Sequence, residues 1–183
     1  MTDLSGKKIA FVVANEGVEQ VELTEPWKAV EEAGATPVLI APEGDDVQAF
    51  DHLDKADTFP VDVTTAEADP SEYAAVVLPG GVANPDHLRQ DEGARRIVRA
   101  AADAGTPLAV ICHGPWTLID AGVASGRTLT SWPSLQTDLR NAGATWVDEE
   151  VVVDDSGPGP LITSRNPDDL PAFTKALVDA LSG

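Results

Sequence analysis

The 183-residue chain has little cysteine and little positive charge, and each shortage excludes a class of protein. A single cysteine, Cys112, cannot form an intrachain disulfide, so a disulfide-stapled secreted fold is excluded. Lysine and arginine number 12 against 31 aspartates and glutamates, which gives a formal net charge of -19 and a pI near 4.2. Nucleic acid and anionic membrane surfaces both need a basic footprint, so neither is an expected partner.

Long apolar runs are also missing. The first apolar stretch, residues 9–14, is too short for a membrane span or a signal-peptide core, and acids follow it closely. We therefore expect a cytoplasmic protein. The acids are scattered, which favours a solvated surface, including one suited to a salt-rich cytoplasm, over a cation-binding role.

Signals for a metal or a cofactor are weak. Three dispersed histidines and one cysteine do not make a metal site, and we expect His52 and His87 on the surface. No phosphate-binding glycine loop follows an expected strand. The sequence therefore predicts neither a metal nor a cofactor.

Short β-rich apolar runs alternate with longer segments of helical period. The expected strands are residues 9–13, 36–41, 73–78, 107–111 and 161–163, with 146–153 ambiguous. The expected helices are residues 23–33, 92–104, 115–121, 134–142 and 168–181. Apolar runs without alternation are typical of strands buried on both faces of a parallel sheet. The pattern predicts an α/β three-layer sandwich with a mostly parallel sheet.

Residues 42–60 break this alternation. They are polar, and we expect a loop or a small hairpin there. No internal repeat or low-complexity tract divides the chain, so we expect residues 1–183 to form one domain.

Cys112 follows an expected strand directly, and Gly114 and Pro115 then open an expected helix. Ligands bind beyond the carboxyl ends of parallel strands, so this turn faces the expected site. A thiol there lies at the positive end of a helix dipole, which favours the thiolate. A lone cysteine is more often a small buried hydrophobe. A core cysteine has no need of such a turn, however, so we favour a nucleophile.

Two other strand ends carry candidate residues. His113 is either a general base, which needs an orienting acid such as Asp86 or Glu19, or a helix-start residue contributing only its backbone N–H. Gly80 and Gly81 form either a plain tight turn or, through the Gly81 amide and the amide after the nucleophile, an oxyanion hole. Glu19 is by default a solvated acid, but a carboxyl buried beside a thiolate would donate a hydrogen bond to sulfur.

Together these elements resemble the PfpI intracellular protease family, which belongs to the class I glutamine amidotransferase-like superfamily together with a deglycase. The matching motifs include Leu-Pro-Gly-Gly at 78–81, Asn-Pro-Asp-His-Leu-Arg at 84–89 and Ala-Val-Ile-Cys-His-Gly-Pro at 109–115. Class I glutaminases usually show Gly-x-Cys-x-Gly followed by a His-x-Glu pair. Val110 replaces the first glycine and no such pair follows Cys112, so glutamine hydrolysis is not expected.

The resemblance implies a flavodoxin-like sheet with a nucleophile elbow at Cys112. It implies that Glu19 contacts the sulfur, that His113 is the catalytic histidine and that Asp86 supplies the histidine with an acid. In some relatives that acid comes from a neighbouring subunit, so a homodimer or a larger homo-oligomer is implied. Asp86 is one methylene shorter than the glutamate that some relatives carry.

The family's activities are peptidase, cofactor-independent glyoxalase and deglycase, all of which begin with thiolate attack on a carbonyl carbon. We therefore expect a stress-response cysteine enzyme that acts on reactive aldehydes or glycated adducts. One alternative is an intracellular cysteine peptidase that uses the same site. Another is a redox sensor without turnover, in which Cys112 is oxidised.

Overall fold

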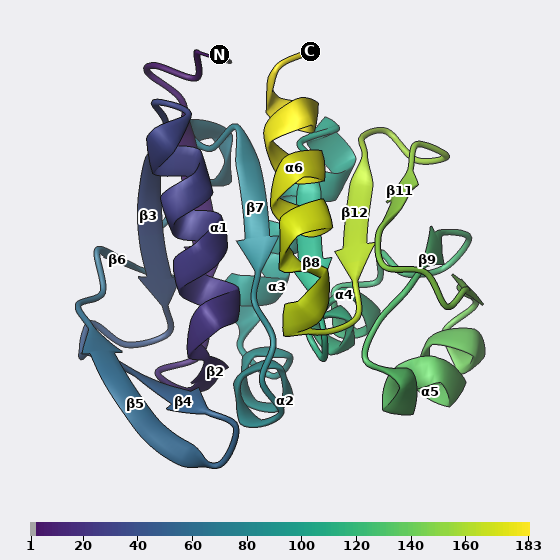
Figure 1. The fold of residues 1–183 in the computed structure, drawn as a ribbon, viewed down its shortest axis with the longest axis horizontal. Helices are drawn as coiled ribbons and strands as arrows, with labels where there is room; N and C mark the ends of the chain where they lie inside the picture. The colour runs from purple at the N-terminus through teal and green to yellow at the C-terminus, as the bar shows by residue number, and fades with distance from the viewer. Residues whose placement is uncertain (1–2) are drawn as a thin grey trace.

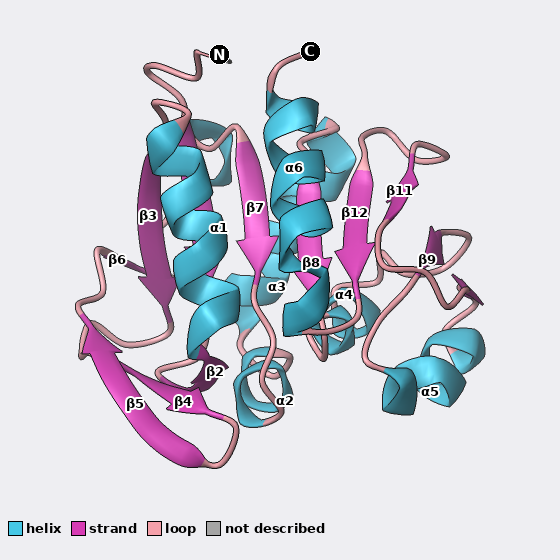
Figure 2. Ribbon diagram, viewed as in Figure 1, coloured by secondary structure: helices cyan, strands magenta, loops and turns pink. Residues whose placement is uncertain are grey.

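A computed structural model describes residues 3–183, and its centre is a seven-stranded sheet (Figures 1 and 2). The strand order is β11-β12-β8-β7-β1-β3-β6, and neighbours are parallel except for β11, which runs antiparallel to β12. The strands are β1 (Lys8–Val12), β3 (Thr36–Ala41), β6 (Val63–Thr64), β7 (Ala75–Leu78), β8 (Leu108–Ile111), β11 (Val152–Asp154) and β12 (Leu161–Ser164).

Helices cover both faces of this sheet because its strands are apolar on both sides. In β1, Ile9 and Phe11 pack into one core and Ala10 and Val12 into the other, and all four are fully buried. Helices α1 (Gln20–Glu32) and α6 (Leu170–Leu181) cover the first core. Helices α3 (Glu92–Ala104), α4 (Pro115–Asp120) and α5 (Gln136–Asn141) cover the second. Among residues 3–183, none of the helices has the length and apolar character needed to cross a membrane.

This architecture confirms the expected three-layer fold, with differences in several elements; helix α2 (Ala83–Leu88), for example, was not expected. Helix α1 begins three residues before the expected start at residue 23. The segment 146–153 is two separate strands, β10 (Thr145–Trp146) and β11, and β10 pairs with β9 (Thr128–Leu129) outside the main sheet. Short 3-10 turns at Pro133–Leu135 and Pro167–Asp169 precede α5 and α6, so these helices begin two residues later than expected. A further 3-10 turn spans Pro70–Glu72.

We expected the polar segment 42–60 to form either a loop or a small hairpin, and it forms a hairpin. Strands β4 (Val47–Asp51) and β5 (Asp54–Phe59) are antiparallel, and β2 (Glu16–Glu19) pairs in parallel with β4. These three strands form their own sheet below the carboxyl ends of β1 and β3, next to helix α2 (Ala83–Leu88) (Figure 1). The hairpin therefore lies at the edge where ligands of such folds bind.

A buried amide joins the strand ends at this edge. The Oδ1 atom of Asn84 accepts a hydrogen bond from the Ala14 amide at 2.7 Å, just beyond β1. Its Nδ2 atom donates to the carbonyls of Pro79 and Gly80, just beyond β7, at 3.0 and 2.9 Å. Asn84 is fully buried, so it fixes the Gly80–Gly81 turn relative to β1.

Replacing Asn84 by alanine is expected to destabilise the fold by about 3 kcal/mol, because it leaves the Ala14 amide and the Pro79 carbonyl without partners and the Gly80 carbonyl with only the Glu19 amide at 3.4 Å. Urea unfolding followed by tryptophan fluorescence measures the change. The control is Asn141→Ala on the exposed end of α5, which should change the free energy of unfolding by less than about 0.5 kcal/mol. Equal effects of the two substitutions would contradict the assigned role of Asn84.

Candidate active site

Cys112 lies on the turn between β8 and α4 in a strained backbone conformation. Its φ is +62°, a left-handed value that costs a non-glycine residue about 1–2 kcal/mol. Two backbone hydrogen bonds hold it there: its amide donates to Ser164 at 3.0 Å, and its carbonyl accepts from Trp132 at 2.8 Å. The turn presents the sulfur beyond the sheet edge, as a nucleophile elbow requires.

Gly80 meets Cys112 from the neighbouring strand β7. A Cβ atom on Gly80 would lie 2.6 Å from the Cys112 Cβ and would collide with the carboxylate of Glu22, so only glycine fits. Its amide donates to Glu22 Oε2 at 2.7 Å. That amide is therefore engaged, whereas the two amides of the expected oxyanion pair, those of Gly81 and His113, both lie close to the Cys112 sulfur.

Glu22, rather than Glu19, is the acid beside the sulfur, which corrects the contact expected from the resemblance. Glu19 ends β2, and its carboxylate accepts a hydrogen bond from the His52 amide at 3.2 Å, on the hairpin. Helix α1 starts directly after it, and its first turn carries the Glu22 side chain back to the sheet edge. Glu22 shares the buried face of α1 with Pro26 and Val30 at a spacing of four residues, a signal that the sequence contained.

The protonation states of the Glu22 carboxyl and the Cys112 thiol depend on each other. Burial raises the pKa of Glu22 to about 8, the Gly80 amide opposes this shift, and the nearby charge of Glu19 adds to it. Burial also raises the pKa of Cys112; repulsion by an ionised Glu22 adds to this, and the amides of Gly81 and His113 oppose it. A thiolate is therefore disfavoured while Glu22 is ionised, and a protonated Glu22 removes the repulsion and can donate to sulfur.

This balance also corrects the expectation that the helix dipole alone favours a thiolate. Helix α4 has only six residues, and Cys112 is 7% exposed, so desolvation is the larger influence. Glu22 Oε1 is buried without any hydrogen-bond partner. An unpartnered buried carboxyl oxygen is unfavourable unless it carries the proton or receives one during a reaction.

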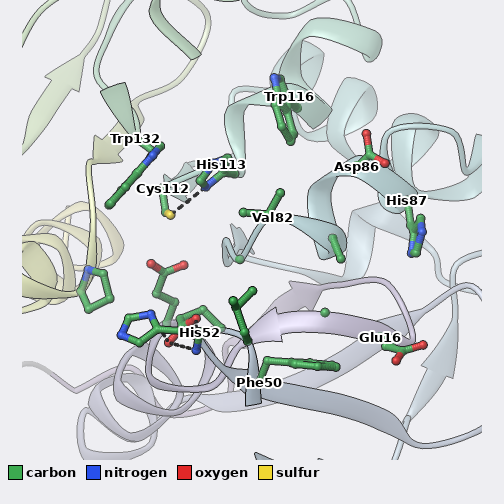
Figure 3. A pocket seen from close by; sticks show the side chains of 17 residues that line it. Glu16, Phe50, His52, Val82, Asp86, His87, Cys112, His113, Trp116 and Trp132 are labelled. Atoms are coloured by element: carbon green, nitrogen blue, oxygen red, sulfur yellow. Dashed lines mark hydrogen bonds and ion pairs between the residues drawn. The ribbon is translucent and has the colours of Figure 1, made fainter. Parts of the chain in front are cut away.

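His113 points back to the sulfur: its Nδ1 lies 3.1 Å from Cys112 Sγ (Figure 3). Its ring stacks on Trp132 with centroids 5.7 Å apart and meets the edge of Trp116 at 5.3 Å. Burial lowers its pKa to about 4, so the imidazole is neutral at pH 7 and can accept a proton. Sequence reasoning missed both tryptophans, although Trp116 follows His113 by three residues, a helical neighbour spacing.

Asp86 does not contact this histidine. It is exposed on α2, and within residues 3–183 no hydrogen bond joins it to His113; Figure 3 shows its carboxylate on the far side of the site. Asp86 nevertheless lines the same cavity as His113. The acid partner expected for His113 is thus near the site without touching the ring.

A cavity of about 770 Å³, the Cys112 cavity, opens in front of the sulfur. It is bounded by β2, the β4–β5 hairpin, α2 and the turn that carries Cys112. His52 and His87 are exposed, as expected, but both line this cavity. Three large apolar side chains at its rim are exposed to 94%, 59% and 40%: Leu53, Val82 and Trp132. The cavity is therefore a wide, apolar-rimmed opening.

One group of side chains on the hairpin could hold a metal ion. Glu19, Asp51 and His52 each bring a possible ligand atom to within 4.8 Å of the others. Asp51 and His52 are exposed, and exposed acidic groups commonly gather in this way without an ion.

Glu22 predicts a specific loss of stability with rising pH. Its pKa in the folded chain, about 8, lies above its ordinary value of 4.5, so its stabilising contribution is fully present below pH 4.5 and is lost as the pH rises through about 8. Between those values the contribution falls by up to about 1.4 kcal/mol per pH unit. His113, whose pKa is lowered from 6.5 to about 4 in the folded chain, contributes the opposite slope between those two values, so the loss due to Glu22 is visible between about pH 6.5 and 8. Urea unfolding at each pH should show the Glu22 slope in that range, and Glu22→Gln should remove it.

The matched control for this measurement is Glu25→Gln, on the exposed face of the same helix. Its pH dependence should follow that of the original chain. If Glu22→Gln keeps the original slope between about pH 6.5 and 8, the carboxyl is not protonated in the folded state.

Comparison with known proteins agrees with this geometry. Residues 7–180 match the DJ-1/PfpI family. Uncharacterized proteins of Staphylococcus saprophyticus and Staphylococcus aureus are 40% and 41% identical over 178 and 177 residues, each match covering 96% of this chain and 98% of the relative.

Solved structures show the same fold. Drosophila melanogaster DJ-1beta has a TM-score of 0.84 and 28% identity, with 100% of this chain and 92% of that chain covered. A two-domain protein from Anabaena variabilis with DJ-1/ThiJ/PfpI-like and ferritin-like domains has a TM-score of 0.88 and 35% identity; the match covers 96% of this chain and 48% of that one. The chain that carries the Cys112 turn, His113 and the buried Glu22 therefore belongs to the DJ-1/PfpI family.

Proposed function

We propose that this chain is a cysteine enzyme that adds its Cys112 thiol to the carbonyl carbon of reactive aldehydes or glycated adducts. The observation that carries the proposal is the 3.1 Å contact between Cys112 Sγ and the neutral His113 Nδ1, beside the buried carboxyl of Glu22. A thiol in contact with an unprotonated imidazole is the arrangement that thiol addition needs, and the lowered pKa of His113 keeps the ring unprotonated at pH 7. We further propose that it works in the cytoplasm, as a homodimer or larger homo-oligomer.

The first step transfers one proton and forms one bond. His113 accepts the thiol proton, and a protonated Glu22 stabilises the resulting thiolate by donating to it. The sulfur attacks the carbonyl carbon, the π electron pair moves to oxygen, and the proton held by His113 passes to that oxygen to give a hemithioacetal. The Gly81 amide, which already points at the sulfur, supports the developing negative charge.

Peptide-bond hydrolysis by the same site is the second candidate. The observation that favours it is the width of the Cys112 cavity, whose apolar rim at Leu53, Val82 and Trp132 leaves room for an extended chain. The redox-sensor alternative has less support, because a sensor needs an exposed thiol of low pKa, whereas burial raises the pKa of Cys112.

Turnover of methylglyoxal, with fluorogenic peptides assayed in parallel, tests the proposal. Cys112→Ser should lower kcat/KM for methylglyoxal to the background rate, since a serine hydroxyl without a strong base is a poor nucleophile. Turnover of peptides but not of methylglyoxal would replace the leading candidate by the peptidase. Equal activity of the variant and the original chain would contradict Cys112 as the nucleophile.

The pH profile tests the role of His113. Because its pKa is about 4, kcat/KM should not fall between pH 7 and pH 5 through protonation of this ring. His113→Gln should lower kcat/KM by about 100-fold or more, and added imidazole should restore part of the rate. An unchanged rate in His113→Gln would leave the ring with an orienting role only.

A further inference from the structure

The Cys112 cavity collects acidic side chains and no basic ones. Glu16 and Glu19, the two ends of β2, and Asp86 on α2 line it (Figure 3 labels Glu16 and Asp86). Within the described residues 3–183, its wall contains neither lysine nor arginine. Its histidines, His52, His87 and His113, are the remaining titratable groups besides Cys112 and Glu22.

Two basic residues, Arg89 and Lys55, lie near the cavity but outside its wall. Arg89 lies over the Trp116 ring at 5.4 Å, but its Nε is bonded to Asp120 at 2.6 Å, and it does not line the cavity. Lys55 is the register partner of Phe50 and so lies on the same face of the hairpin, but it is exposed and does not line the cavity. An anion entering the cavity would therefore meet acids and neither lysine nor arginine in the wall itself.

Aromatic faces and a buried acceptor complete this environment. Phe50, Trp116 and Trp132 line the cavity, and aromatic faces attract cations, with tryptophan the strongest. The unpartnered oxygen of Glu22, on a fully buried side chain, also lines it. This oxygen is an observation independent of the exposed acids: it is satisfied only when it carries a proton that it donates to the sulfur, or when a bound cationic group donates to it.

We propose that the carbonyl compound taken up by the Cys112 site carries a positively charged group, a guanidinium or an ammonium, close to its reactive carbonyl. This inference rests on the proposed thiol chemistry and names its substrate class. The cation lies between the acids of the cavity wall and the aromatic rings, while the carbonyl carbon faces Cys112. Anionic carbonyl compounds are excluded by repulsion from the same acids.

A bound cation also assists the chemistry. A positive charge a few ångströms from the sulfur favours the thiolate and so offsets burial and the charge of Glu22. The covalent step stays balanced: the thiol S–H adds across C=O, a C–S bond forms, and the proton reaches the carbonyl oxygen through His113. No oxidant or reductant is required.

Charged thiol reagents test the charge preference without relying on turnover. Because Cys112 is the only cysteine, intact mass reports its modification alone. The probes are methanethiosulfonates bearing trimethylammonium, sulfonate or only methyl, with 2-mercaptoethanol as the reference thiol and a chelator present because Glu19, Asp51 and His52 could hold a metal. We expect the cation-to-anion rate ratio for Cys112 to exceed the reference ratio by at least about tenfold at low salt.

Matched variants separate the cavity from the overall charge of the chain. Glu16→Gln, Glu19→Gln and Asp86→Asn together should bring the ratio to within about threefold of the reference thiol. Glu31→Gln, Glu92→Gln and Glu149→Gln remove the same number of charges from exposed positions outside the cavity and should leave most of the ratio. Circular dichroism and urea unfolding confirm that both triple variants are folded, and the rates with the two charged reagents are each divided by the rate of the same variant with the neutral methyl reagent.

Aldehydes then distinguish small substrates from peptides. The small pair is 4-guanidinobutanal and glyoxylate, and the peptide pair consists of peptide aldehydes ending in argininal or aspartal. Hemithioacetal formation is measured as protection of Cys112 from iodoacetamide. We expect the cationic member of each pair to protect at a concentration at least about tenfold lower, and the pair with the larger difference identifies the source.

Two outcomes overturn the inference. One is an equal preference of Cys112 and the reference thiol among the charged reagents; the other is an equal loss of preference in both triple variants, which would assign it to the overall charge of -19. In either case normal reaction with neutral aldehydes would leave the proposed thiol chemistry intact. Failure of every aldehyde to protect Cys112, with the reagent preference present, would instead reject the proposed function.

Discussion

The buried carboxyl of Glu22, held between the Gly80 amide and Cys112, is the contact on which the rest of the site depends. It needs helix α1 to begin at Gln20, so that the first turn reaches the sheet edge. It needs glycine at position 80, because any Cβ there would strike both neighbours. The clamp of Asn84 on the Gly80 carbonyl then holds the turn in register with β1. The start of helix α1, the glycine at position 80 and the hydrogen bonds of Asn84 are therefore all needed to place the Glu22 carboxyl beside Cys112.

This arrangement is costly for folding and useful for chemistry. A carboxyl with a buried unpartnered oxygen and a cysteine with a φ of +62° each lower stability by amounts that a core would normally avoid. Both lie within the cavity wall, and strain and unsatisfied groups commonly concentrate at functional sites. Burial raises the pKa of both Glu22 and Cys112, so at pH 7 the carboxyl holds a proton that it can donate to the sulfur during a reaction.

Much of this could be predicted from the sequence, and the exceptions have physical reasons. The expected strand 36–41 and helix 92–104 coincide with β3 and α3, because a doubly buried apolar run and a glycine-terminated amphipathic period are strong local signals. Cys112 and the Gly80–Gly81 turn were identified from the strand-to-turn pattern. The acid was misplaced because Glu16, Glu19, Glu22 and Glu25 are alike as residues, and only the helix start decides which one turns inward.

Other parts of the site depend on contacts between distant segments. The stacking of Trp132 on His113 joins positions 19 apart, and the Glu19–His52 contact joins β2 to the hairpin across 33 positions. Local periodicity carries no information about either. Asp86 shows the reverse case. Its place in a matching motif was clear from the sequence, but the sequence did not show that its side chain, on the six-residue helix α2, does not contact His113.

The hairpin has an evolutionary consequence. Strands β4 and β5 form one wall of the cavity but belong to a sheet separate from the seven-stranded one, and none of their hydrogen-bonded strand pairs involves the central strands. Val47 and Ala49 of β4 are fully buried in the core, so changes there would disturb the fold. Insertions or replacements in the exposed turn at residues 51–55, which carries His52 and Leu53, would reshape the substrate entrance while leaving the nucleophile, its glutamate and the folding core in place. A fold organised in this way can exchange one substrate range for another by altering a single contiguous stretch of its gene.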